Sequence, residues 1–141
     1  MMFADSSRAE LRRRYLEAWQ RRRDGVPLTP LDAQIADVIE MHPEYQAALQ
    51  QPQALASDFT VEQGRTNPFL HMGLHLGLRE QLATRRPAGI EQLHARLAAR
   101  LGDAHEAEHR MIEVLAETLW EAQRAGRAPD EAAYLERLRK L

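Results

Sequence analysis

Residues that start and end helices divide this sequence into short segments, and apolar residues recur about every third or fourth position within each segment. Pro30 and Pro68 stand where a helix can begin, because proline fits the first helical turn. Gly25, Gly102 and Gly126 stand where a helix can end. No stretch alternates apolar and polar residues with the β-branched enrichment that is typical of strands. The sequence therefore predicts an all-α fold.

The predicted helices are joined by short connections. We expect helices over residues 7–24, 30–42 with a short continuation to 49 beyond Pro43, 68–84, 90–101, 103–125 and 130–138. Thr60 and Gln63 are spaced as the capping box of a further single turn, and Asn67 is expected to cap the helix that starts at Pro68. This pattern favours one bundle of about five to six helices. A chain of 141 residues fits one such domain, over residues 1–141.

The composition narrows the expected partners and location. Apolar residues make up 44% and charged residues 28% of the chain, and the net charge is −2 at pH 7. This balance does not favour nucleic acid or a membrane as the partner, and no apolar run reaches the roughly 18–20 residues of a membrane span. The first residues lack a signal-peptide pattern, so we expect a cytoplasmic protein, either monomeric or a homo-oligomer. The absence of cysteine excludes thiolate ligands and a cysteine nucleophile.

Two runs of arginine, at residues 12–14 and 21–23, lie in the first predicted helix. Consecutive helical residues fan around the axis, so neither run forms a stripe, and no aromatic residues are interleaved on which bases could stack. We interpret the arginines as a solvated surface. The apolar side of this helix is expected at Leu11, Tyr15, Ala18 and Trp19.

The histidines of the third predicted helix share its apolar face. His71 and His75 are four residues apart, so they lie within about 40° of each other around the helix. Leu74, Leu78 and Leu82 flank them on the same face. Because this apolar stripe is expected to pack in the core, the two imidazoles are expected there too.

A second histidine pair occurs in the fifth predicted helix. His105, His109 and Glu113 follow one another at intervals of four residues. The same face carries Ile112, Ala116, Leu119 and Trp120. His42 extends the apolar stripe at the end of the second predicted helix. Five histidines and one carboxylate from three helices are therefore expected to converge. His94 has no histidine one turn away, and we leave it outside this group.

Converging imidazoles of this kind favour a metal site. Residues one turn apart hold their Cβ atoms about 5–6 Å apart, so a histidine pair can bind one ion and a third ligand can come from another helix. Zinc, iron, manganese and nickel are the candidate ions. Glu44 and Glu108 are spare carboxylates that could orient the ligands. The predicted ligands, for one or two sites, are His42, His71, His75, His105, His109 and Glu113.

Several functions are compatible with this pattern. A metal-dependent enzyme would use a metal-bound water, or an open position for redox chemistry, but no residue pattern selects a reaction. The alternative is a non-enzymatic interaction or scaffold module whose histidines satisfy one another by hydrogen bonds and water. A pH sensor is a third option, because clustered histidines disfavour the folded state once they protonate.

Four motifs of the chain carry a family resemblance. They are Asn67-Pro68-Phe69-Leu70-His71 with His75, Gly102-Asp103-Ala104-His105 with His109, the stretch 31–45 ending in His-Pro-Glu-Tyr, and Trp120 with Ala122-Gln123-Arg124. With these motifs the sequence resembles, over nearly its whole length, the bacterial family named domain of unknown function 1841. The family pattern has a second histidine after His-Pro-Glu-Tyr, where this chain has Gln46. The resemblance implies no particular activity.

Overall fold

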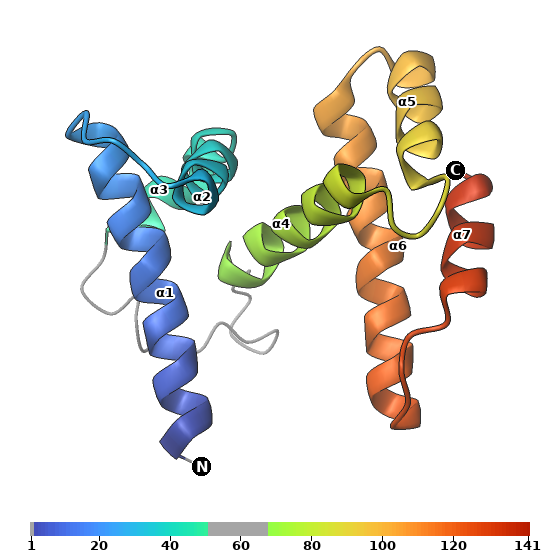
Figure 1. Ribbon diagram of the computed structural model, residues 1–141, viewed down its shortest axis with the longest axis horizontal. Coiled ribbons are helices and arrows are strands. Elements are labelled where there is room, and N and C mark those ends of the chain that lie inside the picture. The colour runs from blue at the N-terminus through green and yellow to red at the C-terminus, as the bar shows by residue number, and fades with distance from the viewer. Residues whose placement is uncertain (1, 51–67) are drawn as a thin grey trace. The chain divides into compact units, whose positions relative to one another are not determined.

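The computed structural model describes residues 2–50 and 68–141, and all the regular structure in these two ranges is helical. The helices are α1 (Met2–Arg23), α2 (Pro30–Glu40), α3 (Pro43–Leu49), α4 (Pro68–Thr84), α5 (Ile90–Leu101), α6 (Ala104–Ala125) and α7 (Glu131–Arg139) (Figure 1). The predicted all-α class is confirmed. These seven described helices exceed the expected five to six because Pro43 begins α3 as a separate helix. None of them is both long enough and apolar enough to cross a membrane.

Contacts along the chain define two compact units, residues 1–73 and residues 74–141, and α4 runs through the boundary. That residues 1–141 form a single domain stays a prediction. The predicted turn at Thr60 and Gln63 and the predicted cap at Asn67 lie outside the described residues.

The helix boundaries follow from the capping residues that the sequence shows. The Thr29 hydroxyl accepts a hydrogen bond from the backbone N–H of Asp32 at 3.2 Å and so caps α2. Asp103 caps α6 by accepting bonds from two backbone N–H groups of its first turn, at 2.9 and 3.2 Å. Gly102 and Gly126 end α5 and α6 with φ values of 73° and 65°, in the left-handed conformation that favours glycine. These predicted boundaries are confirmed.

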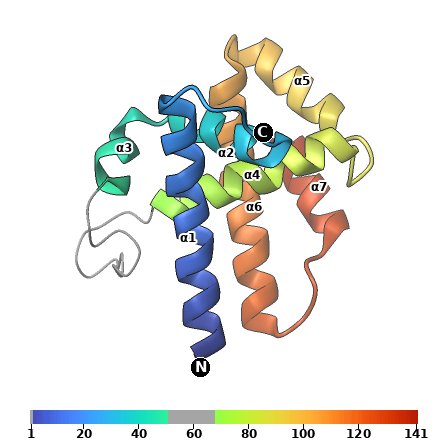
Figure 2. The same cartoon turned by 60° about the vertical axis from the view of Figure 1, so that its left-hand side comes forward.

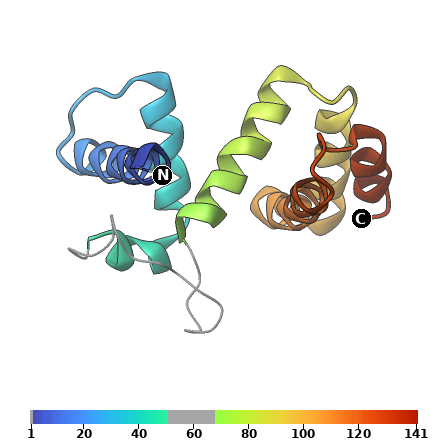
Figure 3. The ribbon, with the colours of Figure 1, turned by 90° about the horizontal axis from the view of Figure 1, so that it is seen from below.

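In the first unit, α1 and α2 pack against one another (Figure 3). A cluster of ion pairs joins the two helices. The Asp32 carboxylate is buried and accepts from Arg14 Nε at 3.2 Å and from Arg21 at 3.0 Å. Arg22 donates to Asp37 and Glu40 of α2, at 2.9 Å in each case. The arginine runs therefore hold α2 against α1.

The predicted faces of α1 need correction at two positions. Arg12, expected on the solvated surface, is buried, and its guanidinium lies 4.7 Å from the centroid of the Phe69 ring. Leu11, expected on the apolar side, is 54% exposed. The reason is that arginine can bury its long aliphatic stem and place its planar charge over an aromatic face. Tyr15, which stacks on the same Phe69 ring at 5.7 Å, is buried as expected.

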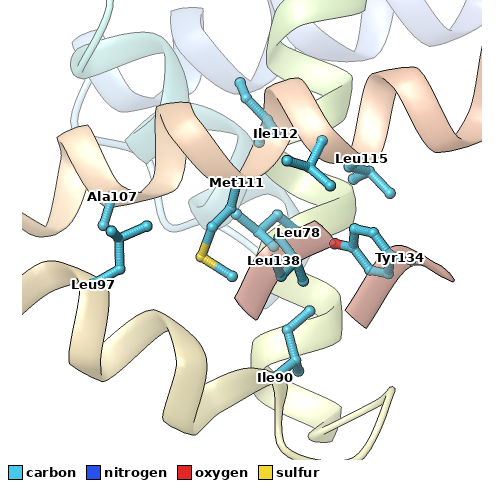
Figure 4. Close-up of a cluster of buried hydrophobic side chains, with 10 residues drawn as sticks. Leu78, Ile90, Leu97, Ala107, Met111, Ile112, Leu115, Tyr134 and Leu138 are labelled. Atoms are coloured by element: carbon cyan, nitrogen blue, oxygen red, sulfur yellow. The ribbon is translucent and has the colours of Figure 1, made fainter. Parts of the chain in front are cut away.

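In the second unit, side chains from α4, α5, α6 and α7 meet in one apolar core (Figure 4). A short connection returns the chain from the end of α6 to α7 (Figure 2). The core residues are Leu78, Ile90, Leu97, Ala107, Met111, Ile112, Val114, Leu115, Tyr134 and Leu138. Tyr134 also donates a hydrogen bond to Gln81 at 2.7 Å, which joins α7 to α4. This core fixes one face of α6, and the same helix carries two of the candidate site histidines.

The Asp32 cluster predicts a pH-dependent contribution to stability. Burial alone would raise the pKa of Asp32, but hydrogen bonds from Arg14 and Thr29 and the charges of Arg14 and Arg21 lower it below 3.8. Because the two arginines are about half exposed to solvent, we expect Asp32→Asn to reduce the free energy of unfolding by only about 1 kcal/mol at pH 7.

This difference is measured by urea denaturation over a range of pH. It should be fully present above pH 3.8, where the unfolded carboxylate is also ionised, and should shrink as the pH falls through the lowered folded-state pKa. Asp37→Asn, whose side chain is 52% exposed, is the matched control and should cost less. An equal loss in both variants would contradict the structural role of Asp32.

The core of the second unit predicts a large difference between two positions on α6. Met111 is 1% exposed and Leu119 is 42% exposed. Met111→Ala should therefore reduce the free energy of unfolding by about 2–5 kcal/mol, through lost burial and a cavity. Leu119→Ala should change it by no more than about 0.5 kcal/mol. Chemical denaturation of both variants checks this, and similar losses would show that the core does not lie where the structure has it.

Candidate metal centre

His42 occupies the break between α2 and α3, where Pro43 prevents the helix from continuing. The side chain is 1% exposed, and its Nδ1 lies 2.7 Å from the backbone carbonyl oxygen of Val38. Because a carbonyl can only accept, the Nδ1–H of His42 donates this bond. In the neutral ring, Nε2 then carries the lone pair.

That lone pair meets a second histidine within the first unit. His42 Nε2 lies 3.2 Å from Nε2 of His71, which is on the first turn of α4, and the two rings meet edge to face. In the absence of an ion, His71 Nε2–H donates to His42 Nε2. The distance is also suited to metal binding, because two nitrogens bound to one tetrahedral ion at about 2.0–2.1 Å are about 3.3 Å apart. The geometry thus fits either a hydrogen bond or a shared ion.

Tyr45, on α3, packs against both of these rings. Its ring stacks on His42 with centroids 5.6 Å apart and contacts His71 at 5.7 Å. Burial and the nearby charge of Glu44 raise the pKa of the Tyr45 phenol. We refer to His42, Tyr45 and His71 as the His42 group.

His75, one turn beyond His71 on α4, is fully buried in the second unit. Its Nδ1 lies 2.6 Å from Oε1 of Glu108, which is on α6. The same oxygen accepts a hydrogen bond from Arg79 Nε at 2.9 Å. Arg79 and His75 are themselves one turn apart on α4, so one carboxylate oxygen of α6 binds two successive turns of α4.

The charge of Glu108 is stabilised by these two partners. Burial by itself raises the pKa of a carboxyl group, but hydrogen bonds from His75 and Arg79, together with the positive charge of Arg79, lower the pKa of Glu108 to about 2. The carboxylate is therefore ionised at neutral pH. It acts as an acceptor for the Nδ1–H of His75, whose Nε2 then carries the lone pair.

Two more imidazoles lie beside His75. His105 and His109, one turn apart on α6, have ring centroids 4.2 Å from each other. The His75 ring lies 4.9 Å from His109 and 5.4 Å from His105, and it is nearly parallel to the latter, with an interplanar angle of 3°. We refer to His75, Arg79, His105, Glu108 and His109 as the His75 group.

Five of the six predicted ligands therefore belong to the two histidine groups, two to the His42 group and three to the His75 group. The structure brings His42 to His71, and it brings His75 to His105 and His109. Helix α4 carries one member of each group, with His71 and His75 one turn apart along the same helix.

Glu113 is the exception, because its side chain is exposed on α6. Each step of four residues advances about 40° around a helix, so two steps carry Glu113 about 80° away from His105. The expected inward face at the C-terminal end of α6 is also wrong, since Leu119 and Trp120 are 42% and 55% exposed. His94, on α5, is half-buried and belongs to neither group.

The sequence did not single out Tyr45 or Arg79 as site residues. Both have a spacing that could have identified them, since Tyr45 follows His42 by three residues and Arg79 follows His75 by four. Glu108 was recognised only as a spare carboxylate. Its burial between two apolar positions of α6, Ala107 and Met111, shows that it faces inward.

The fold and these two groups define an all-helical protein with two buried imidazoles, His42 and His75, each next to further histidines. The chain belongs to the family described as a domain of unknown function (DUF1841), whose model matches residues 7–140. This confirms the family resemblance of the sequence. No curated protein and no solved structure matches the chain.

Proposed function

We propose that this protein binds a divalent transition metal, at one or two sites, and that His42 and His71 of the first unit and His75 and His109 of the second unit are ligands. Each of these side chains offers one ring nitrogen. His105, one turn before His109 and parallel to His75, is a fifth candidate ligand. Glu113 is left out of the ligand set because it is exposed.

The observation that carries this proposal is the hydrogen bonding of two buried rings. His42 donates Nδ1–H to the carbonyl of Val38, and His75 donates Nδ1–H to the carboxylate of Glu108. Metal-binding histidines are typically held in this way, with the far nitrogen fixed on a carbonyl or carboxylate and the near nitrogen left to bind the ion. The arrangement occurs independently in both histidine groups.

The ligand chemistry narrows the ion. An all-imidazole set suits zinc, iron or nickel, whereas manganese, which the sequence also allowed, prefers oxygen ligands. Neutral imidazoles leave the full positive charge of the ion uncompensated, and an ion of this kind strongly lowers the pKa of a bound water. A metal-dependent hydrolytic or redox activity would be compatible with such a centre.

A second function is favoured by one feature of the His42 group. His71 Nε2–H can donate to His42 Nε2 at 3.2 Å, so this pair is satisfied without an ion. The protein would then be a non-enzymatic interaction or scaffold module, with the histidines forming a hydrogen-bond network in its core. Metal content separates the two functions directly.

The proposal predicts one or two transition-metal ions per chain in untagged protein purified without chelator, measured by elemental mass spectrometry. The double variant His71→Ala/His75→Ala should lose the bound metal, because it removes one proposed ligand from each histidine group. His94→Ala is the matched control: it removes a histidine of α5 that belongs to neither group, and it should retain the metal. Circular dichroism checks that each variant remains helical.

Two results would contradict this assignment. Substoichiometric metal after reconstitution with zinc, iron or nickel would favour the hydrogen-bond network. Full metal content in the double variant would show that the ion is bound elsewhere.

A further inference from the structure

Glu108 is an unusual residue for its position on α6. It is 7% exposed, and it lies between the core residues Ala107 and Met111. Removing an ionised carboxylate from water has a cost of several kcal/mol unless its partners compensate for the lost hydration. A position of this kind would ordinarily carry an apolar residue, so the carboxylate has a specific partner to bind.

Two partners meet a single oxygen of this carboxylate. Arg79 Nε donates to Oε1 at 2.9 Å, and His75 Nδ1 lies 2.6 Å from the same atom. The charge of Arg79 balances that of Glu108, so His75 need not be positively charged for the trio to be neutral. A neutral imidazole is the form that binds a metal ion.

The bond also determines which nitrogen of His75 carries the proton. A carboxylate only accepts, so it fixes the hydrogen on Nδ1 and leaves the lone pair on Nε2. It fixes the orientation of the ring as well, because rotation about the side chain would break a short, charge-assisted bond. Arg79 holds the carboxylate in place from the next turn of α4.

From this geometry we infer that Glu108, held by Arg79, is the positioning residue of the His75 group, because it fixes His75 as the Nδ1–H tautomer and leaves Nε2 as the nitrogen that would bind the ion. This inference deepens the proposed function and rests on it for the ion. The tautomer itself is a property of the metal-free protein and can be measured separately.

The test uses the full chain, labelled with ¹⁵N at histidine, and the variants Glu108→Leu and Glu108→Gln. Long-range ¹H–¹⁵N correlation spectra report the tautomer of His75 in the metal-free protein, and competition with a chromophoric chelator measures the affinity for Zn²⁺. Glu117→Leu makes the same substitution at an exposed position of α6 and is the matched control.

We expect the Nδ1–H tautomer at His75 in the wild type. Glu108→Leu removes the acceptor, so the single tautomer should be lost and the Zn²⁺ affinity should fall about 10–100-fold. Glu108→Gln keeps an oxygen where Oε1 lies, so it should keep the tautomer and retain most of the affinity. Glu117→Leu should stay within about twofold of the wild type.

The outcomes distinguish this inference from the proposed function. If Zn²⁺ binds and Glu108→Leu behaves like Glu117→Leu, the positioning role is overturned and metal binding stands. If the wild type binds no Zn²⁺ but its His75 tautomer depends on Glu108, the proposed function fails and the orienting bond stands. An Nε2–H tautomer at His75 in the wild type overturns the inference without any variant.

Discussion

A buried imidazole has both a donor and an acceptor, and leaving either one without a partner costs about 1–3 kcal/mol. The structure satisfies the donor of two buried rings with one hydrogen bond each. His42 places its Nδ1–H on the carbonyl of Val38, in the helix that precedes it, and His75 places its Nδ1–H on the carboxylate of Glu108. In both rings the lone pair is then on Nε2. The proposed function follows from this shared orientation more than from the number of histidines.

Helix α4 is the element on which both histidine groups depend. His71, His75 and Arg79 follow one another at intervals of one turn, so a single helix face supplies a histidine to each group and the cation that compensates Glu108. The acceptor is on α6, whose other residues build the apolar core of the second unit. The orientation of His75 is therefore tied to the packing of α6, because Glu108 moves with Ala107 and Met111.

Much of this could be predicted from the sequence where local chemistry decides the result. Gly102, Asp103 and Gly126 fix helix ends through backbone conformation and capping bonds, and these boundaries are confirmed. Residues one turn apart were correctly expected to gather, as His105 and His109 do. Periodicity failed where small angular errors accumulate over two turns, which left Glu113 exposed. It also failed for Arg12, because a charge pattern does not reveal that an arginine stem will pack on an aromatic ring.

The central claim is that histidine ring nitrogens of this chain bind a transition metal. X-ray absorption spectroscopy of the zinc-loaded protein tests it most directly, since it reports the atoms bound to the ion. The account predicts a first shell of imidazole nitrogens at about 2.0–2.1 Å, with the outer-shell scattering that imidazole rings produce. A first shell made only of oxygen, without imidazole scattering, would contradict it.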